Sequence, residues 1–152
     1  MQVGKVSAVA MLLLITAATG ASAQRGAPDP ERDAVRQLIL SFAQNVQSGN
    51  LAALDSMFPA RGVHILTDTA TVHGLSEYRD RFLKPELARF TDLKFEHASV
   101  EAVVRGTVAW VAFRQNLSGN TATGPVQQSG RGTAVLEKRD GKWIIVHLHV
   151  SR

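Results

Sequence analysis

Four long strand-like runs occupy the chain after Thr91 and constrain its fold more than any other feature. The runs are LKFEHASVEAVV, TVAWVAFRQNLS, VQQSGRGTAVLEKR and KWIIVHLHVS, and only short loops separate them. The RDGKW stretch before the last run is a strong hairpin signal, because Asp-Gly favours the two-residue turn that joins antiparallel strands. The sequence therefore predicts four consecutive antiparallel strands.

Helical spacing dominates the part of the chain before these strands. Apolar residues from Val35 to Val46 recur at intervals of three and four, which predicts a helix lying on a core and ending at the Ser-Gly-Asn of residues 48–50. Shorter helices fit residues 51–58 and 75–90, and Pro85 is expected to kink or interrupt the latter. Between them, GVHILTD and TVHG predict two short strands. This order of elements indicates an α+β layer arrangement.

The first residues have the features of a secretory signal peptide. Lys5 precedes a long apolar run, and Ala-Ser-Ala at residues 21–23 is a signal-peptidase pattern, so we expect cleavage after Ala23 and a periplasmic or secreted product. The apolar run is shorter than the ~20 residues that span a bilayer, which argues against integral membrane association. Residues 24–30 predict a flexible lead-in, and residues 31–152 form one domain.

Composition excludes several classes of function. The chain has no cysteine, so disulfides, a thiol nucleophile and a lipid-modified cysteine are excluded. Its formal net charge is +4, but the basic residues are scattered and form no Lys/Arg-rich block. We therefore expect an evenly solvated surface and no nucleic-acid partner.

Several segments together resemble a known family. QSGNLAALDSMF, the VHG before a helix, AWVAFR, and GRGTAVLEKRDGKWIIVHLHVS resemble the SnoaL-like part of the nuclear transport factor 2-like superfamily, over roughly residues 31–151. The last segment is also similar to the end of the association domain of calcium/calmodulin-dependent protein kinases. The resemblance implies a curved antiparallel sheet wrapped around three N-terminal helices into a cone, with a pocket between the concave face and the helices.

The resemblance does not imply one reaction, because this fold hosts isomerases, cyclases, dehydratases, binding domains and oligomerisation hubs. The ketosteroid isomerases of the superfamily use a tyrosine and an aspartate, and the matching positions here are Phe42 and Leu66, which lack both groups. Asp68 could replace the base, although an aspartate that caps its own turn is the simpler interpretation. Whether the chain is an enzyme stays open.

Residues that could line a pocket come from the third helix and from the strands other than the last. Trp110 and Arg114 share one strand face, and the resemblance places Tyr78 at a pocket position on the third helix. A core role for Trp110 and a solvated strand-end role for Arg114 are the alternatives. The predicted pocket residues are Phe42, Tyr78, Phe82, Trp110 and Arg114.

Strand alternation also sorts the two histidines near the end of the chain. In WIIVHLHV one face is wholly apolar and is expected to face the core. The other face carries Trp143, Ile145, His147 and His149. This second face predicts a homodimer interface, with Trp143, His147 and His149 in it. A metal site on His147 and His149 has the right ligand type, but the remaining histidines lie on other elements, so no metal is expected.

These observations lead to one expectation and two alternatives. We expect an exported domain with an apolar pocket that binds a small organic molecule, including an acidic one, without a cofactor. The first alternative is a cofactor-independent isomerase, dehydratase or cyclase. The second is a purely oligomeric, partner-binding module.

Overall fold

The computed structural model describes residues 29–152, so the predicted signal peptide and most of the lead-in lie outside the described residues. The helical elements are α1 (Pro30–Gln47), a 3₁₀ helix (Leu51–Ser56), α2 (Leu75–Tyr78), a π turn (Arg79–Leu83) and α3 (Lys84–Ala88). The strands are β1 (His64–Leu66), β2 (Thr71–His73), β3 (Thr91–Arg105), β4 (Val108–Thr121), β5 (Gly124–Arg139) and β6 (Lys142–Ser151). This element order confirms the predicted α+β class. No helix within residues 29–152 is long and apolar enough to cross a bilayer.

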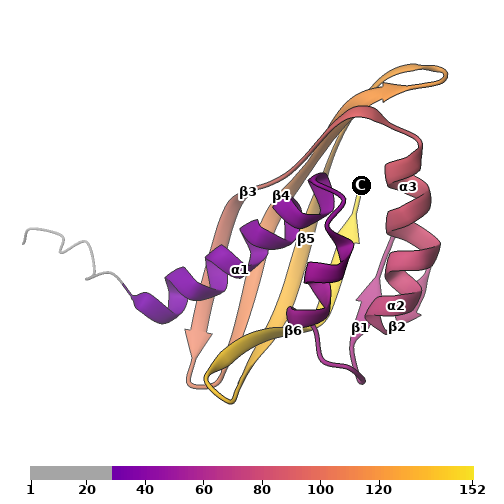
Figure 1. Ribbon diagram of the computed structural model, residues 1–152. Coiled ribbons are helices and arrows are strands. Elements are labelled where there is room, and N and C mark those ends of the chain that lie inside the picture. The colour runs from indigo at the N-terminus through magenta and orange to yellow at the C-terminus, as the bar shows by residue number, and fades with distance from the viewer. Residues whose placement is uncertain (1–28) are drawn as a thin grey trace, which may run out of the picture.

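All six strands form one curved sheet in the order β2-β1-β6-β5-β4-β3. Neighbouring strands are antiparallel except β1 and β6, which are parallel, so the sheet is mixed. The helix α1 lies across the concave face, and α2 and α3 lie beside β1 and β2 (Figure 1). A cone results, because the sheet bends around the helices from both sides.

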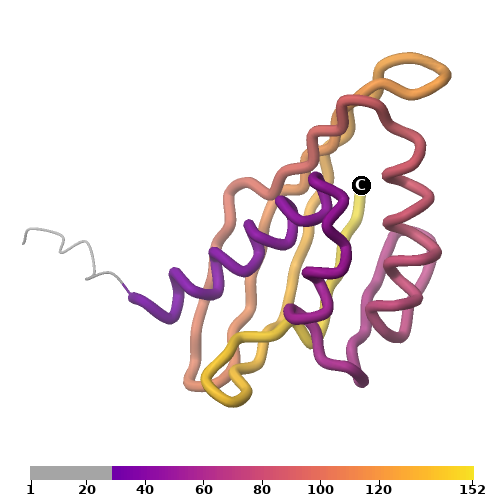
Figure 2. The backbone as a smooth tube through the Cα atoms, viewed as in Figure 1, coloured from indigo at the N-terminus to yellow at the C-terminus, as the bar shows by residue number. Residues whose placement is uncertain are grey.

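The core lies between α1 and the concave face of the sheet. Asp29 begins α1 by accepting hydrogen bonds from the amides of residues 31 and 32, which satisfies donors that the first turn leaves free. The predicted apolar stripe is buried at Val35, Ile39, Phe42, Ala43 and Val46. Figure 2 shows how the tube of α1 runs diagonally over β3, β4 and β5.

The interruption expected at Pro85 occurs one turn earlier, as the π turn. The amide of Lys84 donates to the carbonyl of Arg79, five residues back instead of four. In a regular α-helix the ring of Pro85 would clash with the carbonyl four residues before it, and the wider turn gives that carbonyl room. The rings of Tyr78 and Phe82 are stacked along this helix, with centroids 6.1 Å apart.

Two β-bulges interrupt β3, which forms one edge of the sheet. Its register with β4 shifts by one residue near Asp92 and again near Ser99, and both residues have positive φ (54° and 49°). The second bulge reverses the alternation, so Phe95 and His97 point inward before it and Val100 and Ala102 after it.

A third bulge, in β6, changes which residues face the core. Val135 pairs with His147 but Leu136 pairs with Ile145, which leaves Val146 as the extra residue. Trp143 and Ile145 are therefore buried on the concave side. The Nε1 of Trp143 donates to Glu31 of α1 at 2.7 Å. The prediction that Trp143 and Ile145 lie on the outer face is therefore wrong, because it depends on a strand that alternates without a bulge.

The outer, convex face carries one row of side chains that crosses every strand. These residues follow one another as register partners from strand to strand, and we call them the outer row: Val103, Trp110, Val135, His147, His64 and His73. Trp110 is 47% exposed, which is unusual for so large an apolar side chain.

Candidate functional site

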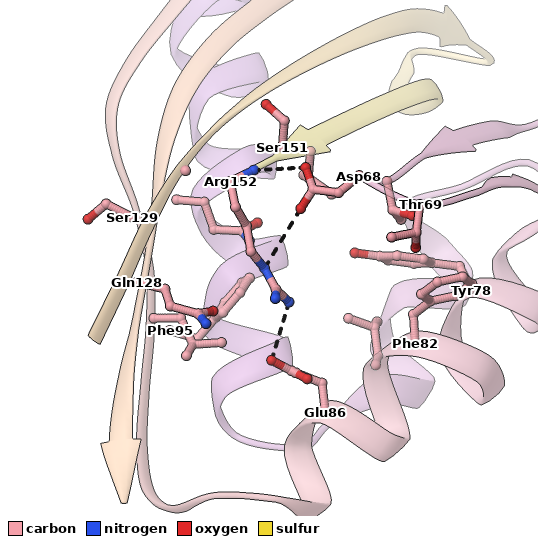
Figure 3. A pocket seen from close by; sticks show the side chains of 16 residues that line it. Asp68, Thr69, Tyr78, Phe82, Glu86, Phe95, Gln128, Ser129, Ser151 and Arg152 are labelled. Carbon is pink, nitrogen blue, oxygen red and sulfur yellow. Dashed lines mark hydrogen bonds and ion pairs between the residues drawn. The ribbon is translucent and has the colours of Figure 1, made fainter. Parts of the chain in front are cut away.

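A cavity of about 190 Å³ opens between the concave face of the sheet and the α2–α3 helix. We call it the cone cavity (Figure 3). Its lining is mixed. The apolar and aromatic part comes from the helix (Tyr78, Phe82 and Leu83) and from the sheet (Phe95, Leu117 and Val150), and the rest is polar or charged, including Gln115, Gln128 and Ser129. The π turn and the bend of the sheet hold these walls apart, so the space exists between rigid elements.

Three charged side chains lie at the mouth of the cone cavity. The guanidinium Nη2 of Arg152 is 3.4 Å from Glu86 Oε1, and its Nε is 3.9 Å from Asp68 Oδ2. The backbone amide of Arg152 also donates to Asp68 Oδ1 at 3.0 Å. Figure 3 shows these groups facing the same space as Tyr78. One cation thus faces two carboxylates, which makes the mouth unfavourable for an anion.

Tyr78 brings a phenol hydroxyl to the wall of the cavity. Burial raises the pKa of Tyr78 above its usual range, and the charge of Arg152 only partly opposes this. The phenol therefore stays neutral at physiological pH and can donate or accept a hydrogen bond.

His97 lies behind the cavity floor in a cluster of aromatic rings. It is 6% exposed, and its Nδ1 is 3.0 Å from the backbone carbonyl of Ile39 in α1. Its ring centroid is 4.1 Å from that of Phe113, 5.5 Å from Phe95 and 5.6 Å from Phe42. A carbonyl oxygen can only accept, so Nδ1 carries the proton in the neutral ring.

The charge state of His97 follows from this burial. Burial lowers the pKa of His97 to about 4, and the hydrogen bond to the Ile39 carbonyl partly opposes the shift. Gln115 is the register partner of His97 on β4 and lines the cone cavity. Within the described residues, neither His97 Nε2 nor Gln115 Oε1 has a hydrogen-bond partner, although both atoms are buried. Such groups are costly to leave unsatisfied.

The structure separates the five predicted pocket residues. Tyr78 and Phe82 line the cone cavity. Phe42 is fully buried in the core, where it stacks on His97. Trp110 and Arg114 lie on the outer face, because the concave side of β4 takes the other set of alternate residues, which is apolar except for Gln115. This placement corrects their assignment to the pocket.

The outer-face histidines lie closer together than their sequence positions indicate. The rings of His64 and His73 are 5.1 Å apart. His147 is partly buried. Burial is the main cause that lowers the pKa of His147, and the charges of His149 and His64 lower it further. Among residues 29–152, no three histidine or acidic side chains are arranged to hold a metal ion.

Sequence reasoning missed His97, Gln115 and Arg152. A signal for His97 was present, because it alternates with Phe95 on an otherwise apolar strand face. Gln115 follows Ala109, Val111 and Phe113 on one face in the same way. Arg152 gave no signal, since its partners come from distant loops and helices.

Comparison with known proteins gives a consistent fold. A family model described as a SnoaL-like domain matches residues 35–152. A proposed ketosteroid isomerase from Shewanella frigidimarina is 24% identical with a TM-score of 0.65, over 78% of this chain and 92% of that chain. A proposed dehydratase of the nuclear transport factor 2-like family from Streptomyces avermitilis is 20% identical with a TM-score of 0.69, over 82% and 97%.

A nuclear transport factor 2-like superfamily protein from Salmonella enterica is 18% identical with a TM-score of 0.68, over 78% of this chain and 91% of that chain. At these identities the solved structures support the fold alone. No curated protein has a matching sequence.

Proposed function

This chain belongs to the family of SnoaL-like domains, and from that membership we propose that it binds a small neutral organic molecule in the cone cavity. The observation that carries the proposal is a cavity between the sheet and the helix with an aromatic and apolar part, lined also by Gln115, whose buried oxygen has no partner within the described residues. Apolar walls with a few fixed polar groups are typical of small-molecule sites.

The size of the cavity limits the ligand. A cavity of about 150 Å³ with apolar walls binds benzene, and the cone cavity measures about 190 Å³. The space therefore suits one ring with a short substituent, or an aliphatic chain of similar volume. Phe82 and Phe95 supply ring faces and edges for such a ligand.

The charges at the mouth favour a neutral ligand over an acidic one. The expectation of an acidic ligand rested on Arg114, which lies on the outer face. Arg152 is the arginine at the cavity, and Asp68 and Glu86 already neutralise it. A carboxylate entering here would meet two negative charges for one positive charge.

We also propose that the domain is exported and forms a homodimer. Support for export comes from the signal-peptide pattern of residues 1–23. Support for the dimer comes from the outer row, where Trp110 lies in the open with Val135 and His147 beside it. Tryptophan is enriched at protein interfaces and is costly to leave in water.

Native mass spectrometry of protein purified from its own host tests the proposed binding. We expect a retained organic molecule that dissociates at higher collision energy, at one copy per subunit. The Leu117→Trp variant fills the cavity from the β4 wall and should lose the adduct. Adducts of equal mass and amount on both proteins would contradict binding in the cone cavity.

A cofactor-independent enzyme is the second candidate, and His97 is the observation that favours it. Its pKa of about 4 keeps the ring neutral, and Nε2 is a lone-pair base directly behind the cavity wall. Incubating the retained molecule in deuterium oxide tests this. Incorporation of carbon-bound deuterium that stops in the His97→Asn variant would support proton transfer, and no incorporation would contradict it.

A further inference from the structure

We propose that Gln115 is the residue that selects the ligand, by accepting a hydrogen bond from a hydroxyl or N–H group, and that His97 positions Gln115 for this role. The inference rests on the proposed binding in the cone cavity and names the chemical class of ligand. It is carried by two buried acceptor atoms that have no partner within the described residues: Oε1 of Gln115, which lines the cavity, and Nε2 of His97, which lies behind it.

The direction of each hydrogen bond at the floor follows from the backbone of α1. The carbonyl of Ile39 can only accept, so the His97 Nδ1 at 3.0 Å must donate to it. A neutral imidazole has one N–H, and burial keeps this ring neutral. His97 Nε2 is therefore a lone pair that only a donor can satisfy.

Gln115 is the neighbour that can satisfy this lone pair. The two residues are register partners on β3 and β4 and both lie on the concave face. An amide that turns its NH₂ toward His97 Nε2 must present its carbonyl oxygen elsewhere. In the structure this oxygen is buried and has no partner among residues 29–152. Turning the amide by 180° gives His97 Nε2 a donor and moves the oxygen to the side of the cone cavity, which Gln115 lines, so that a ligand can reach it.

The resulting floor discriminates between ligands of the same shape. A ring that carries a hydroxyl or N–H satisfies the buried Gln115 Oε1, whereas a ring with a methyl group in its place leaves this oxygen unsatisfied. One net hydrogen bond corresponds to roughly a three- to tenfold change in affinity. The Gln115 oxygen therefore determines the preference for the ring with a donor group. Contacts with the apolar part of the cavity contribute equally to the affinity of both rings.

Two fluorinated probes of equal size test the proposal by ¹⁹F NMR titration of the full domain. The probes are 4-fluorophenol, which has a donor, and 4-fluorotoluene, which has a methyl group in its place. We expect the ratio of their dissociation constants to change about three- to tenfold toward toluene in the Gln115→Met variant, which keeps the side-chain length but removes the amide.

Gln128 supplies the matched control, because it carries the same amide and also lines the cone cavity. The Gln128→Met variant should keep the wild-type ratio. An unchanged ratio in Gln115→Met, or an equal change in Gln128→Met, would overturn the role of Gln115 while leaving cavity binding intact. If the wild type binds neither probe, the proposed function fails and this inference fails with it.

A second measurement does not depend on any variant. The ¹⁵N shifts of the His97 ring in the wild-type protein report which nitrogen carries the proton. We expect protonated Nδ1 and unprotonated Nε2 at neutral pH. The opposite tautomer would overturn the hydrogen-bond directions, and with them the preference for a donor ligand.

Discussion

The buried His97 should make the stability of the domain fall as the pH is lowered from 7 to 5. The pKa of His97 in the native state is about 4, and the ordinary pKa of histidine is 6.5. The unfolded chain therefore binds a proton below pH 6.5 while the native ring stays neutral until about pH 4. The free energy of unfolding therefore falls as the pH decreases from 6.5 to 4. Above pH 6.5 the ring is neutral in both states and nothing has been lost.

The magnitude follows from the two pKa values. The difference between them corresponds to about 3 kcal/mol once both states are protonated, of which about 2 kcal/mol is lost between pH 7 and pH 5. Most carboxylates are still ionised at pH 5, so histidines dominate this interval. A variant of His97 is needed to separate its contribution from that of His147, whose pKa burial also lowers. The same contacts that lower the pKa, burial among Phe42, Phe95 and Phe113, make the ring costly to charge.

Urea unfolding at pH 7 and pH 5 measures the effect. The His97→Asn variant keeps a side-chain N–H for the Ile39 carbonyl, and it should lose about 2 kcal/mol less than the wild type over this interval. The His73→Asn variant, which removes an exposed histidine, serves as the control. Equal losses for the wild type and His97→Asn would refute the reasoning, whatever the absolute stability of the variant.

Three further outcomes are expected. The Gly132→Ala variant should lose about 1 to 3 kcal/mol in urea unfolding, because the added Cβ would lie 2.2 Å from the ring of Phe113; Phe113→Leu in the same chain should recover part of this, and additive losses would contradict the clash. Trp110→Glu should convert the proposed dimer to a folded monomer in sizing experiments; a wild-type monomer at micromolar concentration would contradict the interface. Mass spectrometry of the protein made in its own host should find Gln24 at its N-terminus, and an uncleaved chain would contradict export.

The strand pattern could be predicted because it depends on residues close together in the sequence. The turn between β5 and β6 is made by Asp140 and Gly141, both with positive φ (49° and 78°), as the Asp-Gly pair indicates. The stripe of α1 was equally local, since a helix turns its apolar residues to one side at fixed spacing.

The faces of the strands could not be predicted because bulges have no comparable local signature. The extra residues at Ser99 and Val146 reverse the alternation within a strand, and they depend on the pairing with a neighbouring strand. Trp143 was therefore placed on the wrong side. For β4 the predicted alternation was correct, but the face with Trp110 and Arg114 was wrongly expected to be concave. The charge of Arg114 indicates that this face is exposed to water.

The residues at the cavity floor could not be predicted from the sequence, for a different reason. His97 is held by the carbonyl of Ile39, 58 residues earlier in the chain, and a backbone carbonyl gives no residue-type signal. Its relation to Gln115 depends on the register between β3 and β4, which the first bulge near Asp92 shifts. Only the three-dimensional pairing brings the two unsatisfied atoms together.

The bulges of β3 also affect the tendency of this protein to aggregate at high concentration. β3 is an edge strand of fifteen residues, and a regular edge of that length offers a template on which strands of other molecules can pair and aggregate. The extra residues near Asp92 and Ser99 divide it into shorter segments, none of which presents a long, flat row of backbone groups. Resistance to aggregation is thus encoded in the same irregularities that orient the side chains, and deleting Ser99 should favour fibril formation as well as misplacing the core.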